Sequence, residues 1–431
     1  MILRDPVHGL VSFETDEQSI VPRLLEAKEV QRLRRIRQLG LTSLAYPGAD
    51  HTRFSHAVGA AFVMTRFLAR MRAIHDALPY WQRVTTERAR DALAAALLHD
   101  IGHGPFSHSF EEAMPLGPKH EVWTTRLIRD PDTDVHRILR EHDASMPERV
   151  AELVVGRHDL TYLARAVSGT FDVDRCDYLL RDAYFTGVGY GAFDLDWLLR
   201  SLRLGAPDED DRAPALAIDG PKGLPAIESF ILARLFMFQQ VYFHKASRAS
   251  EWMLSRILAR VRALLCDGVR LGPTPRALES LAVQGDASVN DYLALDDPAL
   301  WSRICEWRTA PDPVLADLSS RIHARKLFKT YELYGESAAL GPRYEALGRA
   351  RDVATRHGLD PDEYVGLDCA SDLPFDDSDA SLSVIFPQGG PRAPGDVSFL
   401  LGRLRGERLE RVRLIFAPEL REDIHLALGS G

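Results

Sequence analysis

The 431-residue sequence contains little cysteine and no long apolar run. Its four cysteines are scattered, with no CxxC spacing, which argues against a zinc ribbon or a disulfide framework and favours reduced thiols. The longest apolar runs, such as ALAAALL, are far too short to span a bilayer. The first residues, MILRDPVHG, lack the pattern of a secretory signal. We therefore expect a soluble, cytoplasmic protein that has no membrane partner.

An excess of basic charge is also absent. The formal net charge is -9 at pH 7, so the sequence does not indicate a nucleic-acid-binding surface, although a local basic patch would leave that partner open. The acidic balance favours a small anionic substrate held by a local basic pocket. No internal repeat or low-complexity tract is present. At 45% hydrophobic and 27% charged residues, the composition is that of an ordinary globular chain, long enough for more than one domain.

Helical periodicity is what the sequence does contain. Apolar residues recur at helical spacing over 17–38, and further apolar patterns predict helices over 53–72 and 86–98. More helices are expected at 120–130, 147–155, 160–168, 174–184 and 225–265. The alternating segment HGLVSFET predicts a hairpin strand near the N-terminus, and residues 198–222 predict a polar β-hairpin between helices.

The last third of the chain changes character. Proline and aspartate become frequent, and SLSVIF, VSFLLG and RVRLIFAP resemble short strands. A soft boundary is expected near 310–325. The fold class is therefore predicted as mainly α with small β-hairpins. We expect a helical core over 1–320, with the hairpin near 198–222 inserted in it, and a small α+β region over 321–431.

A dispersed set of histidines and aspartates supplies metal-ligand side chains: His56, the adjacent pair His99 and Asp100, and Asp174. His99 and Asp100 end the apolar helix expected over 86–98, so both side chains can project into one cavity. Asp174 lies in FDVDRCDYLLRD, where aspartates are dense in an otherwise apolar helix. Because buried carboxylates are costly unless they are paired or bind a metal, at least one of them is expected to be a ligand.

Two more histidines, His103 and His108, follow Asp100 on a turn rich in glycine and proline. Histidines crowded into so short a span would repel one another if protonated, and they would cost desolvation energy if buried. A cation and an anionic ligand remove both problems. Two imidazoles and two carboxylates suit a divalent ion such as Fe, Mn, Zn, Co, Ni or Mg without selecting among them.

Several motifs run in the order found in a known family: DPVHG (5–9), QRLRRIRQLG (31–40), YPGADHTRFSHAVG (46–59), LLHDIGHGPFSH (97–108), KHE (119–121), DVDRCDYLLRD (172–182) and VYFHK (241–245). This series resembles the HD-domain phosphohydrolase superfamily. Within it, the series is similar to the branch of the SAM-and-HD-domain deoxynucleoside triphosphate triphosphohydrolases and their bacterial relatives. The resemblance covers roughly residues 1–250, with RKLFKT (325–330) as a weaker echo. It implies an HD-domain helical core around a metal site.

The resemblance also implies roles for individual residues. The metal ligands of the family match His56, His99, Asp100 and Asp174. The substrate-binding positions match Gln38 and Leu39 for base and sugar, Arg53, Arg175, Arg234 and Lys245 for the phosphates, and Tyr178 and Asp182 for the sugar. Arg175 stands where the family has lysine, which keeps the charge but changes its geometry. Independently of the resemblance, Asp174, Tyr178 and Asp182 fall on one helical face at i, i+4 and i+8.

The implied reaction is metal-dependent hydrolysis of (deoxy)nucleoside triphosphates to nucleoside and triphosphate, by attack of metal-activated water at the α-phosphorus. His108 and His120, oriented by Glu111, are the candidates that protonate the departing 5′ oxygen. His103 is a candidate that stabilises the developing charge. A divalent metal ion is thus the implied cofactor and a nucleotide the implied substrate. Family members assemble as dimers or tetramers, so a homo-oligomer is expected.

The sequence departs from the family in several places. Glu111 stands where the best-known members have aspartate, so the carboxylate is kept with a longer reach. Gln31 and Arg34 match part of the family's regulatory nucleotide pocket. In that pocket Glu26 replaces an aspartate, and a family lysine would fall at Met1. The resemblance therefore does not carry nucleotide activation over to this chain, and it does not include the sterile-alpha-motif domain.

Two alternatives stay open. One is an HD phosphohydrolase that acts on another phosphoester, as a nucleoside mono- or diphosphatase, a cyclic-nucleotide phosphodiesterase or a nuclease, because the metal ligands are compatible with each. The other is a nucleotide sensor without turnover. The retained His108, Glu111 and His120 argue against a sensor, since a pure binder does not need an acid for a leaving group. The sequence selects neither the metal nor the base nor the sugar.

Overall fold

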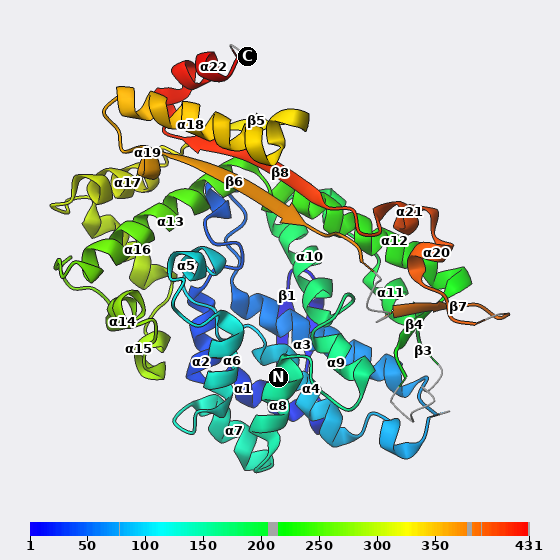
Figure 1. Ribbon diagram of the computed structural model, residues 1–431. Coiled ribbons are helices and arrows are strands. Elements are labelled where there is room, and N and C mark those ends of the chain that lie inside the picture. The colour runs from blue at the N-terminus through cyan, green and yellow to red at the C-terminus, as the bar shows by residue number, and fades with distance from the viewer. Residues whose placement is uncertain (77, 206–213, 377–381, 389, 430–431) are drawn as a thin grey trace.

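A computed structural model of the chain describes residues 1–76, 78–205, 214–376, 382–388 and 390–429. Helices make up most of these residues, and three small sheets accompany them (Figure 1). The prediction of a mainly α fold with small β elements is confirmed. Over the described ranges, no helix has both the length and the apolar character needed to cross a membrane.

A short hairpin opens the chain. Its strands, β1 (Ile2–Asp5) and β2 (Gly9–Ser12), pair antiparallel with Asp5 opposite Gly9, which confirms the strand expected in HGLVSFET. The helical spacing over 17–38 corresponds to several short helices. These residues are divided among η1 (Glu17–Ser19), α1 (Ile20–Leu25), α2 (Lys28–Arg32) and η2 (Leu33–Arg35). The break between the two main helices falls at Ala27, whose backbone is extended (φ -64°, ψ 136°).

Four helices form the centre of the N-terminal half: α3 (Arg53–Arg72), α4 (Thr86–Leu98), α8 (Met146–Val154) and α10 (Val173–Thr186). Helix α3 contacts both α4 and α10, and α4 contacts α8. The small residues AVGAA of α3 and ALAAALL of α4 are buried, which allows the helix axes to approach closely. The helices predicted over 53–72 and 86–98 are confirmed with the same bounds.

Shorter elements surround this centre: η3 (Thr42–Leu44), η4 (Tyr80–Gln82), α5 (His108–Ala113), α6 (His120–Arg129), α7 (Asp134–His142), α9 (Thr161–Val167) and η5 (Gly189–Gly191). The helices expected at 120–130, 147–155, 160–168 and 174–184 correspond to α6, α8, α9 and α10 and are confirmed. Asp172 caps α10 by accepting the Arg175 N–H at 2.7 Å, and the left-handed Gly187 ends the helix.

The strands of the hairpin predicted over 198–222 are β3 (Leu202–Leu204) and β4 (Leu216–Asp219), which pair antiparallel. The ends of the predicted range are helical instead, in α11 (Leu195–Ser201) and α12 (Gly220–Met237). Asp194 favours the helix by accepting the Trp197 N–H at 2.9 Å. The range 206–213 lies outside the described residues. A third strand, β7 (Leu382–Ile385), pairs parallel with β4, so the hairpin is part of a sheet that includes the C-terminal region.

The helical prediction over 225–265 is confirmed in type. Helix α12 continues into a π-helical turn, η6 (Phe238–Tyr242), and α13 (Lys245–Cys266) follows after His244, whose extended backbone interrupts the helix. Four further helices follow: α14 (Arg276–Gln284), α15 (Val289–Leu293), α16 (Asp297–Trp307) and α17 (Pro313–His323).

A second sheet lies near the C-terminus. Its strands are β5 (Lys329–Leu333), β6 (Val365–Asp372) and β8 (Leu409–Phe416), antiparallel in the order β5-β8-β6. Helices α13 and α18 (Leu340–Arg356) pack against it (Figure 1). The remaining elements are η7 (Gly335–Ala338), α19 (Pro361–Tyr364), α20 (Pro394–Val397), α21 (Phe399–Leu404), η8 (Pro418–Leu420) and α22 (Arg421–Gly429).

The strand predictions in this region are confirmed in part. SLSVIF contains β7, and RVRLIFAP contains most of β8. VSFLLG is not a strand, because it forms the end of α20 and most of α21. Ser398 starts α21 by accepting the Leu401 N–H at 3.0 Å. Strands β5 and β6 were not expected.

Two apolar cores hold the molecule together. One is built mainly from the N-terminal helices and α12, and Leu382 and Leu401 from the C-terminal region join it. The other contains α13, the helices after it and the β5-β8-β6 sheet, together with Phe106 and Phe110 from the loop and helix after α4. The segment between α4 and α6 therefore lies between the two cores. The domain boundary at residue 320 stays a prediction.

Candidate active site

Three helices present the four expected metal ligands. His56 lies in the first turn of α3 and is fully buried. His99 and Asp100 directly follow the last residue of α4, and Asp174 lies in the first turn of α10. Because α3 packs against both α4 and α10, side chains that are more than 100 residues apart meet at one place.

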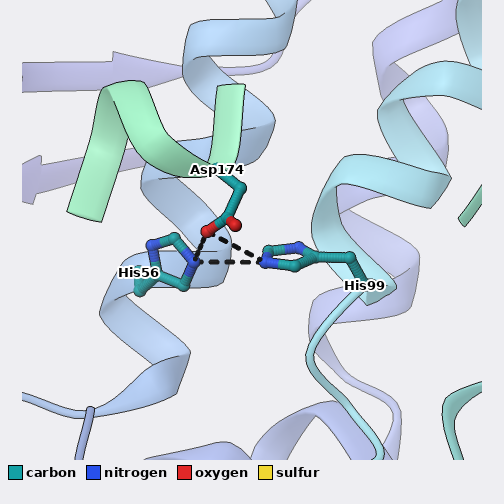
Figure 2. Close-up of side chains that lie close together, drawn as sticks. All are labelled: His56, His99 and Asp174. Atoms are coloured by element: carbon teal, nitrogen blue, oxygen red, sulfur yellow. Dashed lines mark hydrogen bonds and ion pairs between the residues drawn. The ribbon is translucent and has the colours of Figure 1, made fainter. Parts of the chain in front are cut away.

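The donor atoms of His56, His99 and Asp174 lie close together (Figure 2). His56 Nε2 is 3.2 Å from His99 Nε2 and 3.0 Å from Asp174 Oδ1, and His99 Nε2 is 3.4 Å from the same oxygen. The carboxylate of Asp100 is 3.5 Å from His99 Nε2 and 3.8 Å from His56 Nε2. Ligand atoms that surround one ion at about 2.0–2.2 Å stand about 3 Å apart. His56, His99 and Asp174 could therefore hold a divalent metal ion. Asp100 lies beside them, and its role as the fourth ligand stays a prediction.

Burial and charge at this cluster favour a cation. Burial by itself lowers the pKa of His56, but the carboxylates of Asp174 and Asp177 outweigh it and raise that pKa to about 10. Burial is likewise outweighed by Asp100 and Asp174 at His99, whose pKa is raised. Carboxylates that hold protons on these imidazoles would hold a divalent cation in the same way, and metal binding would release the protons. The donor set does not select one metal.

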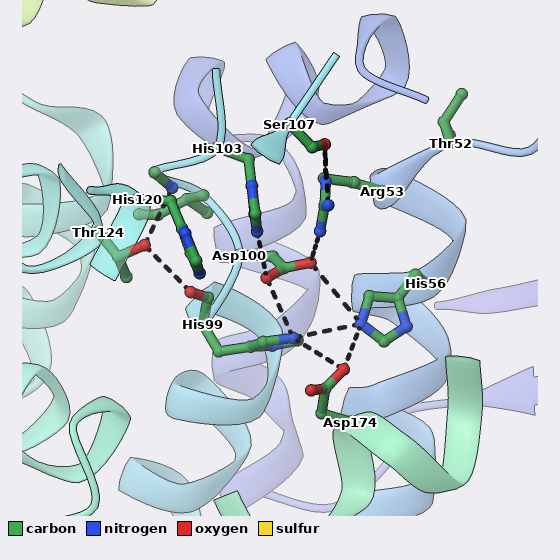
Figure 3. Close-up of polar contacts among 12 residues, drawn as sticks. Thr52, Arg53, His56, His99, Asp100, His103, Ser107, His120, Thr124 and Asp174 are labelled. Carbon is green, nitrogen blue, oxygen red and sulfur yellow. Dashed lines mark hydrogen bonds and ion pairs between the residues drawn. The ribbon is translucent and has the colours of Figure 1, made fainter. Parts of the chain in front are cut away.

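Arg53 reaches from the start of α3 to the loop after α4 (Figure 3). Its Nε and Nη2 donate to Ser107 Oγ at 3.0 and 2.8 Å, and its Nη1 is paired with Asp100. Phe106 and Ser107 both have a φ of 54°, which L side chains rarely adopt. Asp297, at the start of α16, accepts the Phe106 N–H at 2.8 Å. The strained loop is thus held from both sides, and Arg53 fixes the orientation of a predicted metal ligand.

His120 begins α6 and lies close to the turn after Asp100 because position 102 is glycine. A Cβ on Gly102 would lie 2.2 Å from the His120 carbonyl oxygen and 2.3 Å from the Thr124 nitrogen. His120 Nδ1 is 2.8 Å from Glu111 Oε1, which also accepts the His120 backbone N–H at 3.0 Å. The carboxylate therefore orients the imidazole and favours a proton on Nδ1, which leaves Nε2 for proton exchange.

His103 and His108 flank this pair. The His103 ring stacks on His120, with centroids 3.9 Å apart and 15° between the planes. Burial and the charge of Arg53 lower the pKa of His103 well below its usual value, so this imidazole is neutral near pH 7. The side chain of His108 is 67% exposed, and its Nδ1 lies 3.5 Å from Glu111 Oε2. Although burial raises it, hydrogen bonds with His108 and His120 hold the pKa of Glu111 well below its usual value.

Tyr178 and Asp182 follow Asp174 on one face of α10, and all three line the same cavity. Asp182 is buried, with Oδ1 2.8 Å from His51 Nε2 and Oδ2 accepting the Tyr242 hydroxyl at 2.7 Å. Burial and the nearby Asp174 raise the pKa of Tyr178, which keeps its phenol a neutral hydrogen-bond donor. This face of α10 therefore offers the Tyr178 hydroxyl and the Asp182 carboxylate next to the predicted metal ligands.

The cavity has a volume of about 460 Å³, which lies in the range of small-molecule sites. Near Asp100 and Asp174 its wall consists of imidazoles and carboxylates. The same wall also contains the polar Gln38, the apolar Leu39 and four aromatic residues, Phe106, Phe238, Tyr242 and Phe243, together with the charged Glu112, Arg248 and Glu251. Gln38 Oε1 is buried and has no hydrogen-bond partner among the described residues, so it offers an acceptor to a ligand.

Most residues predicted for the site meet at this cavity. Those that line it are Gln38, Leu39, Arg53, Asp100, His103, His108, His120, Asp174, Tyr178 and Asp182. His56, His99 and Glu111 contact members of that group from outside the lining.

Three predicted phosphate-binding cations are not part of the lining. Arg175 turns back to donate to the Gly169 carbonyl at 2.8 Å. Arg234 Nη2 is bound by both Asp372 oxygens, at 2.9 and 3.1 Å. Lys245 is exposed at the start of α13. Their contacts with a phosphate chain stay a prediction.

Four side chains at the site were given no role of their own from the sequence: His51, Ser107, Asp177 and Tyr242. All four lie inside or beside motifs that were recognised, such as FDVDRCDYLLRD and VYFHK. The aspartate-rich segment already signalled Asp177. The missing information was spatial, because each of the four acts through a partner far away in the sequence.

Comparisons with known proteins match two ranges of this chain to family models and most of its length to a relative. Residues 53–182 match a family model described as HD domain, and residues 194–265 match one described as HD associated region. The YwfO protein of Bacillus subtilis is 35% identical over 375 residues, which cover 87% of this chain and 81% of that protein. The first matched range contains all four residues of the proposed metal cluster.

Two further likenesses concern activity. A deoxynucleoside triphosphate triphosphohydrolase SAMHD1 homolog of Dictyostelium discoideum is 27% identical over 265 residues. The match covers 59% of this chain and 48% of that protein, so the chain spans about half the length of that relative. The solved structure of a phosphohydrolase from Bacteroides thetaiotaomicron superposes with a TM-score of 0.78 at 29% identity, covering 96% of this chain and 99% of that one.

Proposed function

The chain belongs to the HD-domain phosphohydrolase family, and we propose that it hydrolyses (deoxy)nucleoside triphosphates to nucleoside and triphosphate. The observation that carries this proposal is the composition of one cavity. It joins a metal-ligand set, a histidine oriented by a carboxylate, and the Tyr178–Asp182 face of α10. These groups suit, in turn, a divalent ion, proton transfer to a leaving group, and the hydroxyl groups of a sugar.

The first part of the proposal is the attack on phosphorus. A divalent ion held by His56, His99, Asp100 and Asp174 would polarise a phosphoryl oxygen and lower the pKa of a water molecule. Attack of water on the α-phosphorus forms one P–O bond and breaks the bond to the 5′ oxygen. Arg53 lies at the same edge of the cavity, where its charge would neutralise phosphate oxygens.

The departing 5′ oxygen needs a proton, and His120 is the proposed donor. Its Nδ1 is held by Glu111, so a second proton on Nε2 is available for transfer. His103, neutral and stacked on this ring, would donate a hydrogen bond to the developing charge. His108 has a longer contact with the same carboxylate and is largely exposed, so it is the second candidate for the acid.

The remaining groups would orient the nucleoside. Tyr178 and Asp182 are proposed to hold the sugar, since their oxygens lie one and two turns beyond Asp174 on α10. Gln38 and Leu39 are proposed to meet the base, in the wall that also contains Tyr242. Apolar and aromatic walls are typical of sites that bind the flat faces of a base.

The proposal is tested by an assay of the eight canonical nucleoside and deoxynucleoside triphosphates with added Mn²⁺, Mg²⁺ or Zn²⁺. We expect nucleoside and triphosphate as products. Phosphate or pyrophosphate as the released product would contradict the proposal and favour another phosphoester activity. Binding of nucleotides without turnover under every metal would favour a sensor.

A His120→Ala variant tests the assignment of the acid. We expect kcat to fall by about 10²–10⁴-fold, the usual contribution of a general acid, while nucleotide binding is retained. The matched control is His425→Asn, which removes an exposed imidazole on α22 and should leave both quantities unchanged. If His108→Ala loses the activity and His120→Ala keeps it, His108 is the acid and His120 is not.

A further inference from the structure

Asp177 is a completely buried carboxylate that lies one turn after Asp174 on α10 and faces α3. Its Oδ2 is 2.8 Å from His56 Nδ1, and its Oδ1 is 2.6 Å from His8 Nε2. Arg181 donates to both oxygens, from Nε at 2.8 Å and from Nη2 at 2.9 Å. Two oxygens that each take two partners saturate the carboxylate, so its position and orientation are fully determined.

The same network reaches the first residues of the chain. Arg181 Nη1 donates to Asp5 Oδ2 at 2.8 Å. Asp5 Oδ1 accepts the backbone N–H groups of Val7 and His8, both at 2.9 Å, which fixes the turn between β1 and β2. This turn places the His8 ring next to Asp177. The side chains of His8 and Arg181 are almost completely buried, so this network is shielded from competing water.

Helix α3 leaves space for the network at Gly59. A Cβ at this position would lie 1.9 Å from Asp177 Oδ1 and 2.4 Å from Arg181 Nη2. Gly59 is buried within α3, one turn after His56, where glycine weakens a helix by about 1 kcal/mol relative to alanine. The glycine at position 59 is therefore explained by the approach of the carboxylate and guanidinium of α10.

We propose that Asp177 is the positioning residue of the metal site and that the N-terminal hairpin holds it in place through His8 and Arg181. By accepting the Nδ1–H of His56, the carboxylate fixes the tautomer and ring orientation that direct Nε2 towards His99 and Asp174. Asp177 does not line the cavity; it acts only through His56. The inference rests on the metal site of the proposed function.

The experiment measures metal affinity directly, without substrate. Mn²⁺ is titrated into the full-length protein in competition with a chelating dye, for the wild type, Asp177→Asn and His8→Ala. Loss of an outer partner of a metal ligand typically weakens binding by about 10–100-fold. We expect that range for Asp177→Asn and a smaller loss for His8→Ala, which removes one of the four contacts.

The matched control is Asp91→Asn. Asp91 is also a buried carboxylate paired with an arginine, with its Oδ2 2.6 Å from Arg149 Nε, but it lies on the far side of α4, against α8. This variant should lose stability and keep the wild-type dissociation constant for Mn²⁺. The absorption spectrum of the Co²⁺-loaded protein gives a second readout, which should change in Asp177→Asn and stay constant in Asp91→Asn.

Wild-type Mn²⁺ affinity in a folded Asp177→Asn variant would overturn the inference alone. If Asp177→Asn does not fold, His8→Ala decides: weakened metal binding supports the link to the hairpin, and wild-type binding overturns it. A wild-type protein that binds no divalent ion would overturn the metal site itself, and with it both the inference and the proposed function.

Discussion

At the scale of single residues, the orientation of the proposed metal ligands depends on contacts from other elements: Asp177 of α10 contacts His56, and Arg53 of α3 contacts Asp100. The candidate ligands His56, His99 and Asp174 could be predicted because a histidine or an aspartate in an apolar helix is costly to bury unless it is paired or binds a metal. The partner of Arg53 could not, because Ser107 reaches it only through a loop conformation with positive φ. Local sequence indicates which groups carry chemistry, whereas their orientation depends on contacts made across the fold.

Arg234 gives a prediction at this scale. Its Nη2 is held by Asp372, but its Nε is buried without a hydrogen-bond partner among the described residues. If Arg234 binds the phosphate chain, Arg234→Gln should raise KM for a triphosphate roughly tenfold or more, since a hydrogen bond to a charged group contributes about 1.5–3 kcal/mol. The inhibition constant of the corresponding monophosphate, which lacks the terminal phosphates, should change much less.

Steady-state kinetics of the triphosphate, with the monophosphate added as a competitive inhibitor, measure this difference. The control is Arg126→Gln, because Arg126 forms a comparable ion pair with Asp286 at 2.6 Å on the exposed surface. Equal effects of Arg234→Gln on the triphosphate and the monophosphate would mean that Arg234 stabilises the fold and does not bind the phosphate chain.

At the scale of helices and strands, periodicity alone predicts the long helices well. Helices α3 and α4 were predicted with the same bounds that the structure has, because each buries a continuous apolar face. The strand predicted for VSFLLG was wrong, because the apolar pattern contains no information about the hydrogen bond by which Ser398 caps α21. The helical spacing over 17–38 did indicate helices, but it did not show that the extended backbone of Ala27 separates α1 from α2.

Asp297 connects α16 with the loop that contains Phe106, and its titration provides a test of this connection. It accepts the backbone N–H groups of Arg37 at 2.9 Å and Phe106 at 2.8 Å. Burial raises the pKa of Asp297 to about 6, from its usual value of 3.8. The folded state therefore binds the Asp297 proton more tightly than the unfolded state does, and protonation stabilises the fold. This stabilisation is complete below about pH 4 and is lost as the pH rises through 6.

The Asp297→Asn variant mimics the protonated side chain and removes this titration. Relative to the variant, the wild type should lose about 1–2 kcal/mol of unfolding free energy between pH 5 and pH 7.5. Urea unfolding at the two pH values measures it. A difference between the two proteins that does not vary with pH would contradict a raised pKa at Asp297.

At the scale of the whole molecule, the C-terminal third was the least predictable part. Strand β7 pairs with β4 across more than 160 residues of sequence, and β8 lies between β5 and β6. Pairings of this kind depend on contacts that no local pattern contains. The second core extends from this sheet to Phe106 and Phe110 beside the site, so the C-terminal region supports the loop that carries the proposed catalytic histidines.

Metal binding should stabilise the whole chain. At a metal concentration 100 times the dissociation constant, one bound ion adds about 2.7 kcal/mol. With an unfolding entropy of about 2.1 cal/mol/K per residue, Tm of the 431-residue chain should rise by about 3 °C. Calorimetry of the chelated protein before and after addition of Mn²⁺ measures the shift. His99→Ala should abolish it, and an undiminished shift in that variant would place the ion elsewhere.

The central claim is the attack of water at the α-phosphorus with release of an intact triphosphate. Hydrolysis of a deoxynucleoside triphosphate in ¹⁸O-labelled water, followed by mass spectrometry of both products, tests it most directly. We predict one ¹⁸O atom in the triphosphate and none in the nucleoside. Label in phosphate or pyrophosphate, or in the 5′ hydroxyl of the nucleoside, would contradict the proposed reaction.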